Sequence, residues 1–446
     1  MRFALRYTAL AAVAALCALS ACSGDDAPAK DPAAAEGTAY VSVRLLVAQP
    51  EATRLGPAGG GDGDGREPGM DRENAVSDVT LLLYRQSDAS TGLNGDGTAT
   101  VEHTVYFPTL AASADGTAYT SEAAECGITA ASGAWHAIVV ANMGDVSTEY
   151  QGKTVAAVRD DIIKEAWTPA ADAEQCSGFV MASAEDATLD FADGDGSRAN
   201  PYILSTSVER VAARIDIAPG GGAWSAADGT YTYHVLAEGG TDTGDRFVLR
   251  SVTPVNVMAE GSYLLKRVCG EGGTDIEYLG AETADADKRQ TNWVLDPWTL
   301  SGKNASLYAG TAADVAAKPA EHTDSDGDSY YILAYAMENT TLDNDPAFAT
   351  SLRFTGTYYK AADWNTETGR PAEGATGEEK TFTYTLRHSD PDGEGNASQP
   401  MLYGTVRNNI YRVKIDGVAY EGGSPQLQAT INVRKWALFC HSGIVM

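Results

Sequence analysis

The sequence predicts an all-β protein made of two β-sandwich domains in tandem, with one short helix. Many short runs of β-branched and aromatic residues recur along the chain, each bounded by Gly, Asp, Asn or Ser. The first run shows the pattern most clearly, because Ala39, Val41, Val43 and Leu45 alternate with a second set of side chains. A period of two is typical of a half-buried strand, and many such strands separated by turns favour sandwiches.

Further strands are expected at regular intervals. They are Val76–Tyr84, Val101–Phe107, Trp135–Ala141, Tyr202–Ile217, Phe247–Met258, Tyr330–Met337, Leu352–Tyr359, Phe382–Leu386, Asn409–Ile415 and Leu427–Val433. Residues 153–165 are the helical candidate, since Val155, Val158 and Ile162 lie on one stripe.

The first 21 residues have the features of a lipoprotein signal peptide. Arg2 and Arg6 precede an apolar stretch, Ala9–Leu19, that is too short to span a bilayer. Leu19-Ser20-Ala21-Cys22 then has the form of a lipobox, which predicts a covalent lipid on Cys22. An ordinary cleaved signal peptide followed by a chance cysteine is the alternative.

Residues 22–36 are expected to form a lipidated tether, and the rest divides into two domains. The first spans 37–205 and the second 206–446, with a turn-rich segment at 193–197 just before the boundary. Within the first domain, residues 37–54 form a separable first strand. Residues 55–72, rich in Gly and Asp, are expected to be a flexible loop. Arg54, Arg66 and Arg72 are therefore candidate protease sites.

The charge balance excludes nucleic acid as a partner. The formal net charge is -29, and loss of Arg2 and Arg6 with the signal peptide takes it to -31. Such a surface repels nucleic acid and favours solubility outside the cell.

The cysteines match no metal site. Cys126, Cys176, Cys269 and Cys440 follow Cys22, and none forms a CxxC pair. Export permits a disulfide, for which Cys126 and Cys176 are the plausible partners, and buried free thiols are the alternative.

No catalytic centre or cofactor site is predicted. The histidines are scattered, and neither a GxSxG elbow nor a Walker loop is present. Asp324-Ser325-Asp326-Gly327-Asp328 spaces its carboxylates as a calcium loop does. However, Ser329 and Tyr335 stand where an EF-hand requires Gly and Glu. A solvated acidic turn is the simpler interpretation.

Four segments together resemble the fimbrillins, the subunits of type V pili. The segments are Trp135-His136-Ala137-Ile138-Val139-Val140-Ala141-Asn142, Val208-Glu209-Arg210-Val211-Ala212-Ala213-Arg214-Ile215, Tyr335-Ala336-Met337-Glu338-Asn339-Thr340, and Arg407-Asn408-Asn409-Ile410-Tyr411 followed by Ile431-Asn432-Val433-Arg434-Lys435-Trp436. Their order, with the lipobox and the Thr53-Arg54 junction, extends the resemblance over nearly all of residues 37–446.

The resemblance implies two transthyretin-like, Greek-key sandwich domains in a lipoprotein precursor held at the outer membrane and displayed in a surface fimbrium. An arginine-specific protease would remove the first strand, and copies would then polymerise by donor-strand exchange with one another and with accessory subunits. Adhesion to a host or bacterial surface receptor is the implied role, and no enzyme activity is expected.

The residues agree with this mechanism. Removing residues 37–54 would expose unpaired ladder groups and apolar side chains, which recruit a strand from another chain. Residues 437–446 are strongly apolar and uncharged, and are the expected donor strand. Its apolar residues are Leu438, Phe439, Cys440, Ile444 and Val445.

Three other functions remain open from the sequence. A fimbrial tip or anchor subunit would carry an adhesive domain in place of a donor strand. A glycan-binding surface lipoprotein would present exposed aromatics. Its candidates are Trp293, Trp298, Tyr358 and Tyr359. A secreted hydrolase is the third class, for which no residue pair is distinguished.

Overall fold

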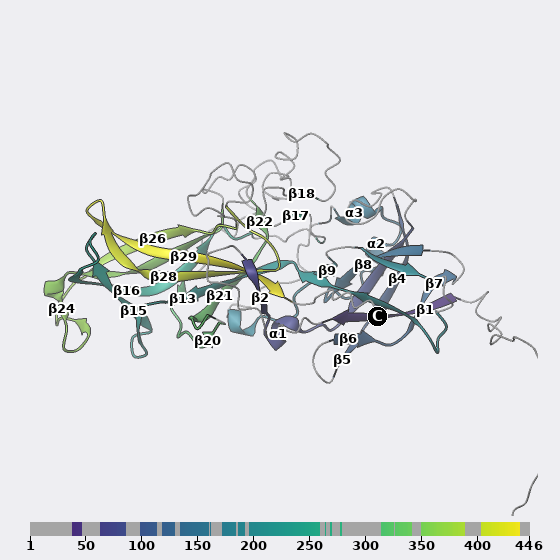
Figure 1. Cartoon of the computed structure of the whole chain (residues 1–446), viewed down its shortest axis with the longest axis horizontal. Coiled ribbons are helices and arrows are strands. Elements are labelled where there is room, and N and C mark those ends of the chain that lie inside the picture. Colours follow the sequence, from purple (N-terminus) through teal and green to yellow (C-terminus); the bar gives the residue numbers. More distant parts are fainter. Residues whose placement is uncertain are drawn as a thin grey trace, which may run out of the picture.

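Two groups of strands lie end to end along the long axis of the molecule in the computed structural model (Figure 1). The structure describes residues 38–46, 63–85, 99–113, 118–129, 134–159, 161, 172–183, 186–191, 196–258, 264, 268–269, 277–278, 314–324, 326–340, 349–388 and 403–437. The described residues are mainly strands, which confirms the predicted all-β class. No helix among these residues is long and apolar enough to cross a membrane.

The first domain begins with a sheet of order β11-β1-β6-β5, in which β7 also pairs with β1. Its strands are β1 (Thr38–Leu46), β5 (Leu110–Ala112), β6 (Ala118–Ser121), β7 (Ala124–Thr129) and β11 (Tyr202–Thr206). The alternating residues Ala39, Val41, Val43 and Leu45 are each no more than 1% exposed. The predicted two-residue period therefore directs one face of β1 into the core.

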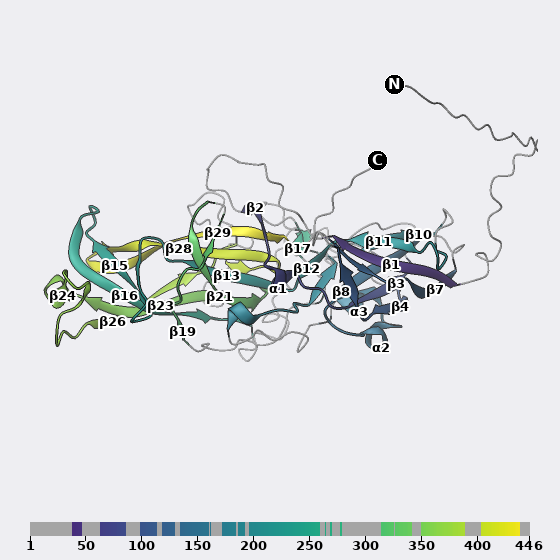
Figure 2. The ribbon, with the colours of Figure 1, turned by 90° about the horizontal axis from the view of Figure 1, so that it is seen from below.

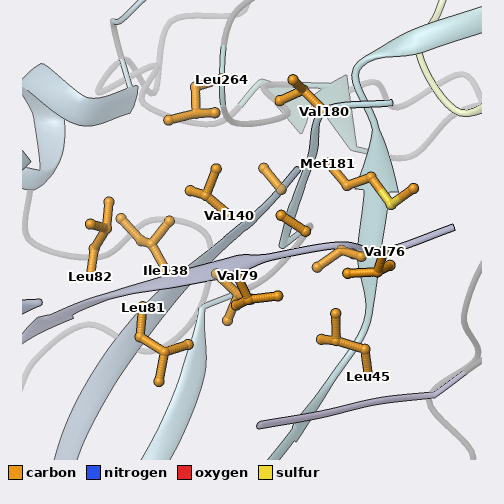
Figure 3. Packing of buried hydrophobic residues seen from close by; sticks show 14 of the residues in the cluster. Leu45, Val76, Val79, Leu81, Leu82, Ile138, Val140, Val180, Met181 and Leu264 are labelled. Atoms are coloured by element: carbon orange, nitrogen blue, oxygen red, sulfur yellow. The ribbon is translucent and has the colours of Figure 1, made fainter. Parts of the chain in front are cut away.

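A second sheet of order β12-β9-β8-β3-β4 packs against the first, and β10 pairs with β8. Its strands are β3 (Val79–Tyr84), β4 (Val101–Phe107), β8 (Ala134–Ala141), β9 (Met181–Ser183), β10 (Ala187–Asp190) and β12 (Val208–Arg210). Side chains from both sheets meet in one apolar cluster, part of which is shown in Figure 3.

Short helices accompany the first domain. They are α1 (Asp71–Asn74), α2 (Ser147–Tyr150), α3 (Val155–Arg159) and the 3-10 turn η3 (Ala173–Gln175). Helix α3 lies inside the helix predicted at 153–165, and Val155 and Val158 are fully buried as their stripe predicts.

In the second domain, hydrogen bonds link the strands into one continuous sheet that lies around an apolar cluster. Its order is β20-β21-β13-β28-β15-β16-β23-β26, and β14, β19, β29 and β2 pair with β15, β16, β28 and β29. Strand β28 pairs with β13 through residues 410–414 and with β15 through 418–419, after a register shift between Ile415 and Gly417. This bent strand joins two halves of the sheet around a second apolar cluster.

The strands of this sheet differ widely in length. They are β2 (Gly63–Pro68), β13 (Ala212–Ala218), β14 (Ala223–Ser225), β15 (Thr230–Leu236), β16 (Asp242–Val255), β19 (Val315–Ala316), β20 (His322–Thr323), β21 (Ser329–Met337), β23 (Ser351–Tyr359), β26 (Glu378–Thr385), β28 (Asn409–Glu421) and β29 (Ser424–Ala437). Minor pairs are β17 (Val268–Cys269) with β18 (Glu277–Tyr278), β22 (Asn339–Thr340) with β27 (Gly404–Thr405), and β24 (Trp364–Asn365) with β25 (Arg370–Pro371), which follows the 3-10 turn η5 (Ala361–Asp363).

Two details depart from the sequence prediction. The domain boundary lies later than residue 205, because β12 still pairs with β9 and the chain enters the second-domain sheet at Ala212. Residues 63–68 and 71–72, expected within the flexible loop 55–72, lie in β2 and α1 instead. Strand β2 runs parallel to the end of β29, so backbone pairing orders a segment whose composition suggests a loop.

Candidate assembly site at the domain junction

Strand β1 occupies an interior position in its sheet. It pairs with β11 in parallel through residues 41–45, and with β6 and β7 in antiparallel on its other side. Burial of Val41, Val43 and Leu45 contributes about 2 kcal/mol each to its attachment. Removal of β1 would therefore leave a slot with unpaired backbone groups on both walls and an apolar floor. We call the position that β1 fills the β1 slot.

The C-terminal end of β1 and the end of β29 both lie at the junction between the domains. Leu45 is opposite Thr206 of β11, and β11 leads directly to β12 and then to β13 in the second domain. Strand β29 ends at Ala437, which pairs with Pro68 of β2. Figure 2 shows β1 directed toward the centre of the molecule, where β2 and the end of β29 lie.

Buried arginines of the second domain meet glutamates of the β2–α1 segment at this junction. Arg412 donates to both oxygens of Glu67, at 2.8 and 2.9 Å. Arg214, which is fully buried, donates to Glu67 at 3.0 Å and to Glu73 at 3.2 Å. Asp216 accepts from both arginines. We call this set of side chains the junction network.

Glu73 also joins segments that are remote in sequence. Its side chain is 0% exposed and accepts hydrogen bonds from the Tyr335 hydroxyl and from the Met70 backbone N–H, the latter at 2.8 Å. Its backbone carbonyl accepts from Nε of Arg210 at 3.1 Å. Burial beside Glu73 raises the pKa of Tyr335 well above its ordinary value, so this hydroxyl remains a donor.

Basic side chains of this protein neutralise the acidic loop at residues 324–328, whose spacing resembles a calcium loop. Asp324 accepts from Arg412 at 2.9 Å, Asp328 accepts from Lys414 at 2.8 Å, and Asp326 pairs with Arg434. Within the part of the chain that the structure describes, no group of three or more acidic, histidine or cysteine side chains is placed to hold a metal ion. The loop is thus a partner of the junction network.

Several residues of the four fimbrillin-like segments contact one another at this junction. Arg407 pairs with the buried Glu338 at 3.1 Å, which joins the closing motif to the Tyr335–Thr340 motif. Arg210 donates to Asn408 at 3.2 Å. At the end of β8, Asn142 adopts a φ of 58° and donates to the carbonyls of Ala75 and Phe179. These motifs therefore mark contacts that fix the two domains and the β2–α1 segment together.

The predicted site residues are divided between described and undescribed parts of the chain. Cys22, Arg54, Leu438, Phe439, Cys440, Ile444 and Val445 lie outside the described residues. Arg66 lies in β2 opposite Lys435, and Arg72 lies in α1 with its guanidinium 3.0 Å from Glu174. The last two are thus in ordered, hydrogen-bonded segments.

The structure also bears on two other possibilities that the sequence left open, a disulfide and a glycan-binding surface of exposed aromatic side chains. Cys126 and Cys176 are both buried and are not joined to each other by a disulfide, which was one of the two alternatives. Tyr358, a candidate glycan-binding aromatic, is 4% exposed and bonds to Asp245, while Tyr359 packs near Trp364. Neither tyrosine forms an open platform. Trp293 and Trp298 lie outside the described residues.

Sequence reasoning did not identify Glu67, Glu73, Arg214 or Arg412. A signal was present for the arginines, because Arg214 and Arg412 each stand between apolar neighbours within a predicted strand. A charge inside a buried strand requires a partner. The partners were not identifiable, since Glu67 and Glu73 lie in a segment with a loop-like composition, far away in sequence.

Solved structures that are similar to this chain over most of its length share little sequence identity with it. A putative cell adhesion protein from Parabacteroides distasonis is 14% identical, with 90% of this chain and 98% of that chain covered at a TM-score of 0.47. A fimbrilin from Porphyromonas gingivalis is 15% identical, covering 91% and 99% at a TM-score of 0.42. The tip fimbrial protein Mfa3 of the same species is 10% identical, covering 90% and 100% at 0.40.

Residues 39–212 match the family described as "Major fimbrial subunit protein (FimA)". A search of curated proteins finds no match. The molecule is thus an all-β protein, part of which is similar to the major subunits of fimbriae. This match over residues 39–212 confirms the predicted resemblance to the fimbrial subunits. That family comprises structural subunits of cell-surface fimbriae and not enzymes.

Glu67→Gln tests the junction network. Glu67 is largely buried, which acts to raise its pKa, but the hydrogen bonds and charge of Arg412 and the charge of Arg214 outweigh burial and lower it below 4.5. Its stabilising contribution is therefore present above pH 4.5 and is lost as the pH falls through the lower, folded-state pKa. We expect Glu67→Gln to reduce the free energy of unfolding by roughly 3 kcal/mol at pH 7, and the deficit to shrink below pH 4.5.

Denaturant titrations from pH 7 to pH 3 measure this deficit. Glu367→Gln is the matched control, because it removes the same charge from an exposed turn. Equal stability of the two variants at pH 7 would contradict the role given to Glu67.

Proposed function

We propose that this protein is made as a lipidated precursor, is activated by proteolytic removal of β1, and polymerises when the C-terminal strand of another copy fills the β1 slot. One observation carries the proposal. Strand β1 lies between paired neighbours and buries one apolar face, yet it precedes a connection of residues 47–62 that contains Arg54. A single cut in that connection would turn β1 into a replaceable peptide.

Contacts of the β2–α1 segment support Arg54 over Arg66 and Arg72 as the cleaved residue. A protease requires an extended, accessible backbone, so cutting within β2 or α1 would need local unfolding. Such unfolding would detach Glu67 and Glu73 from buried arginines, and an unpaired buried charge costs about 3–5 kcal/mol. A cut at Arg54 breaks none of these contacts.

The strand direction that the β1 slot requires favours filling by the C-terminal tail of another copy over filling by the tail of the same chain. Residues 438–446 extend at most about 30 Å, at 3.3 Å per residue. The described part of β29 ends at Ala437, at the junction toward which β1 is directed. To run in the same direction as β1, the tail of the same chain would first have to reach the far end of the slot. That distance uses the full length of the tail, and none of the tail remains to fill the slot. A tail from a second copy has no such constraint, and repeated donation produces an open filament.

Lipid attachment at Cys22 would hold the precursor at the outer membrane before assembly. The lipobox supports this part of the proposal, because acyl chains add membrane affinity with each buried methylene. A tip or anchor subunit is the second candidate function, and it differs in carrying no functional donor tail. Burial of Tyr358 removes one of the aromatics on which a glycan-binding role depended.

Arg54→Ala is expected to prevent activation. The variant should keep residues 37–54 attached and should form no SDS-resistant multimers on treatment with an arginine-specific protease. Arg66→Ala and Arg72→Ala, as matched controls, should assemble normally. N-terminal sequencing of surface-recovered protein identifies the cut, and assembly of the Arg54→Ala variant would place it elsewhere.

Deletion of residues 437–446 tests the donor strand. The truncated chain should melt like the full chain, should be cleaved normally, and should form no multimers. Multimers of unchanged length after cleavage would refute donation by this segment. Unfolding of the second domain would show that the tail packs on its own domain.

Cys22→Ala tests the lipid. Metabolic acyl labelling of the precursor should be lost, and surface display should fall sharply. The conservative control Ser23→Ala leaves the lipobox intact and should change neither. Normal display of the Cys22→Ala variant would contradict anchoring through this residue.

A further inference from the structure

The apolar core of the first domain includes side chains that belong to the second. Tyr335 and Met337 of β21 and Ile410 of β28 are buried in the same cluster as the side chains of β3 and β8. The ring of Tyr335 meets that of Phe179, which precedes β9, edge to face with centroids 4.8 Å apart. Aromatic pairs in this geometry attract each other beyond the area that they bury. The end of the second-domain sheet therefore closes one side of the first-domain core.

Leu264 adds a contact from a different part of the second domain. It lies in the segment between β16 and β19, is 0% exposed, and belongs to the cluster that contains Val140 and Val180 (Figure 3). Its backbone N–H donates to the carbonyl of Asp161, just after α3, at 3.0 Å. Its carbonyl accepts from Nη1 of Arg407 at 3.0 Å. The backbone of one residue is thus tied to both domains.

Arg407 requires such acceptors because it is buried. Its side chain is 1% exposed and also pairs with the buried carboxylate of Glu338 at 3.1 Å. A buried guanidinium without acceptors would destabilise the fold strongly. The carbonyl of Leu264 is therefore held by a charge-assisted hydrogen bond in the interior, which fixes where its side chain enters the first-domain core.

Polar contacts at the surface of the same junction contribute less. Lys318 and His322 of the second domain meet Asp172 and Glu174 of the first, at 2.6 and 3.1 Å. All four side chains are partly exposed, and ion pairs in that situation add little to stability because water screens them. The buried apolar contacts therefore dominate the support that the second domain gives to the first.

Strand β1 supplies another part of the same core. Its inward residues, from Ala39 to Leu45, belong to the first-domain cluster, and β11, β6 and β7 pair with it. Removing β1 would therefore take away both apolar contacts and backbone pairs, in a domain whose net stability is a small difference between large terms. The contacts of Tyr335 and Leu264 described above do not involve β1 and would remain.

We propose that the second domain is a built-in support that keeps the first domain folded while the β1 slot is empty. Leu264 and the junction ends of β21 and β28 form the supporting contact. The statement about the empty slot rests on the proposed function, whereas the support itself is a property of the intact chain. Without it, the first domain would open its core once β1 had left, and exposed apolar surface promotes aggregation and degradation.

The first test uses the intact, uncleaved chain and follows hydrogen exchange of the backbone amides of β8. Leu264→Ala leaves a cavity in the first-domain core, so these amides should exchange roughly tenfold faster or more. Leu264→Met keeps the volume and should restore exchange to within about threefold of the unsubstituted chain. Ile203→Ala removes the same number of carbon atoms from an exposed position on β11 and should leave exchange unchanged. Unchanged exchange in the Leu264→Ala chain would overturn the support.

The second test uses a chain that begins at residue 55, the form that remains after a cut at Arg54, at concentrations where it is monomeric. With Leu264 in place, the amides of β8 should stay protected. Leu264→Ala should lower that protection to the level of an unstructured peptide, while β16 and β23 around the second apolar cluster stay protected. An equal effect of Leu264→Ala in the two chains would overturn the proposal, as would loss of β8 protection in the shortened chain that retains Leu264.

Failure of the proposed function gives a different result. If Arg54→Ala chains assemble, cleavage at Arg54 is not the trigger, but the effect of Leu264→Ala on β8 in the intact chain is unaltered. If assembly proceeds as proposed and Leu264→Ala has no effect in either chain, the support is refuted and the proposed function stands.

Discussion

The junction between the domains depends on the neutralisation of buried arginines. Arg210 and Arg214 are fully buried and Arg412 nearly so, and each would destabilise the fold without an acceptor. Asp216, next to Arg214 along β13, supplies part of the charge. Asp324 supplies a further charge to Arg412. The rest comes from Glu67 and Glu73, which belong to a segment that continues into the first domain at β3. The ion pairs therefore tie the two domains together through a short strand and a single helical turn.

This constraint separates two segments that are adjacent in the chain. Strand β1 is held by backbone pairing and by aliphatic side chains, which any strand of similar shape can supply. Strand β2 is held by a glutamate that serves Arg412 and Arg214 together, with a bidentate geometry toward Arg412 that a generic strand would not reproduce. The first is chemically replaceable and the second is not. A cut between them detaches the replaceable part and leaves the junction network intact.

The strands were largely predictable from the sequence, and the junction was not. The alternation in Ala39–Leu45 and the apolar run in β8 identify strands because the period of the side chains is a local property. The end of β8 at Asn142 was also visible, although its role in holding Ala75 and Phe179 was not. Strand β2 was missed because its sequence, Gly63-Asp64-Gly65-Arg66-Glu67-Pro68, has a loop-like composition, and only its pairing with β29 makes it a strand. Strand pairing and ion pairs between residues that are hundreds of positions apart leave no pattern in the local sequence.

Under the proposed function, the interior position of β1 would also keep an uncleaved precursor from associating prematurely. An open sheet edge recruits strands from other chains, but β1 leaves no such edge on either of its sides while it is in place. An incoming tail would gain backbone pairs and apolar contacts of the same kind that β1 loses, so exchange in the intact precursor has little net driving force. Under the proposed function, cleavage would change this balance by making the departure of β1 a dissociation into solution, at a low concentration of free peptide.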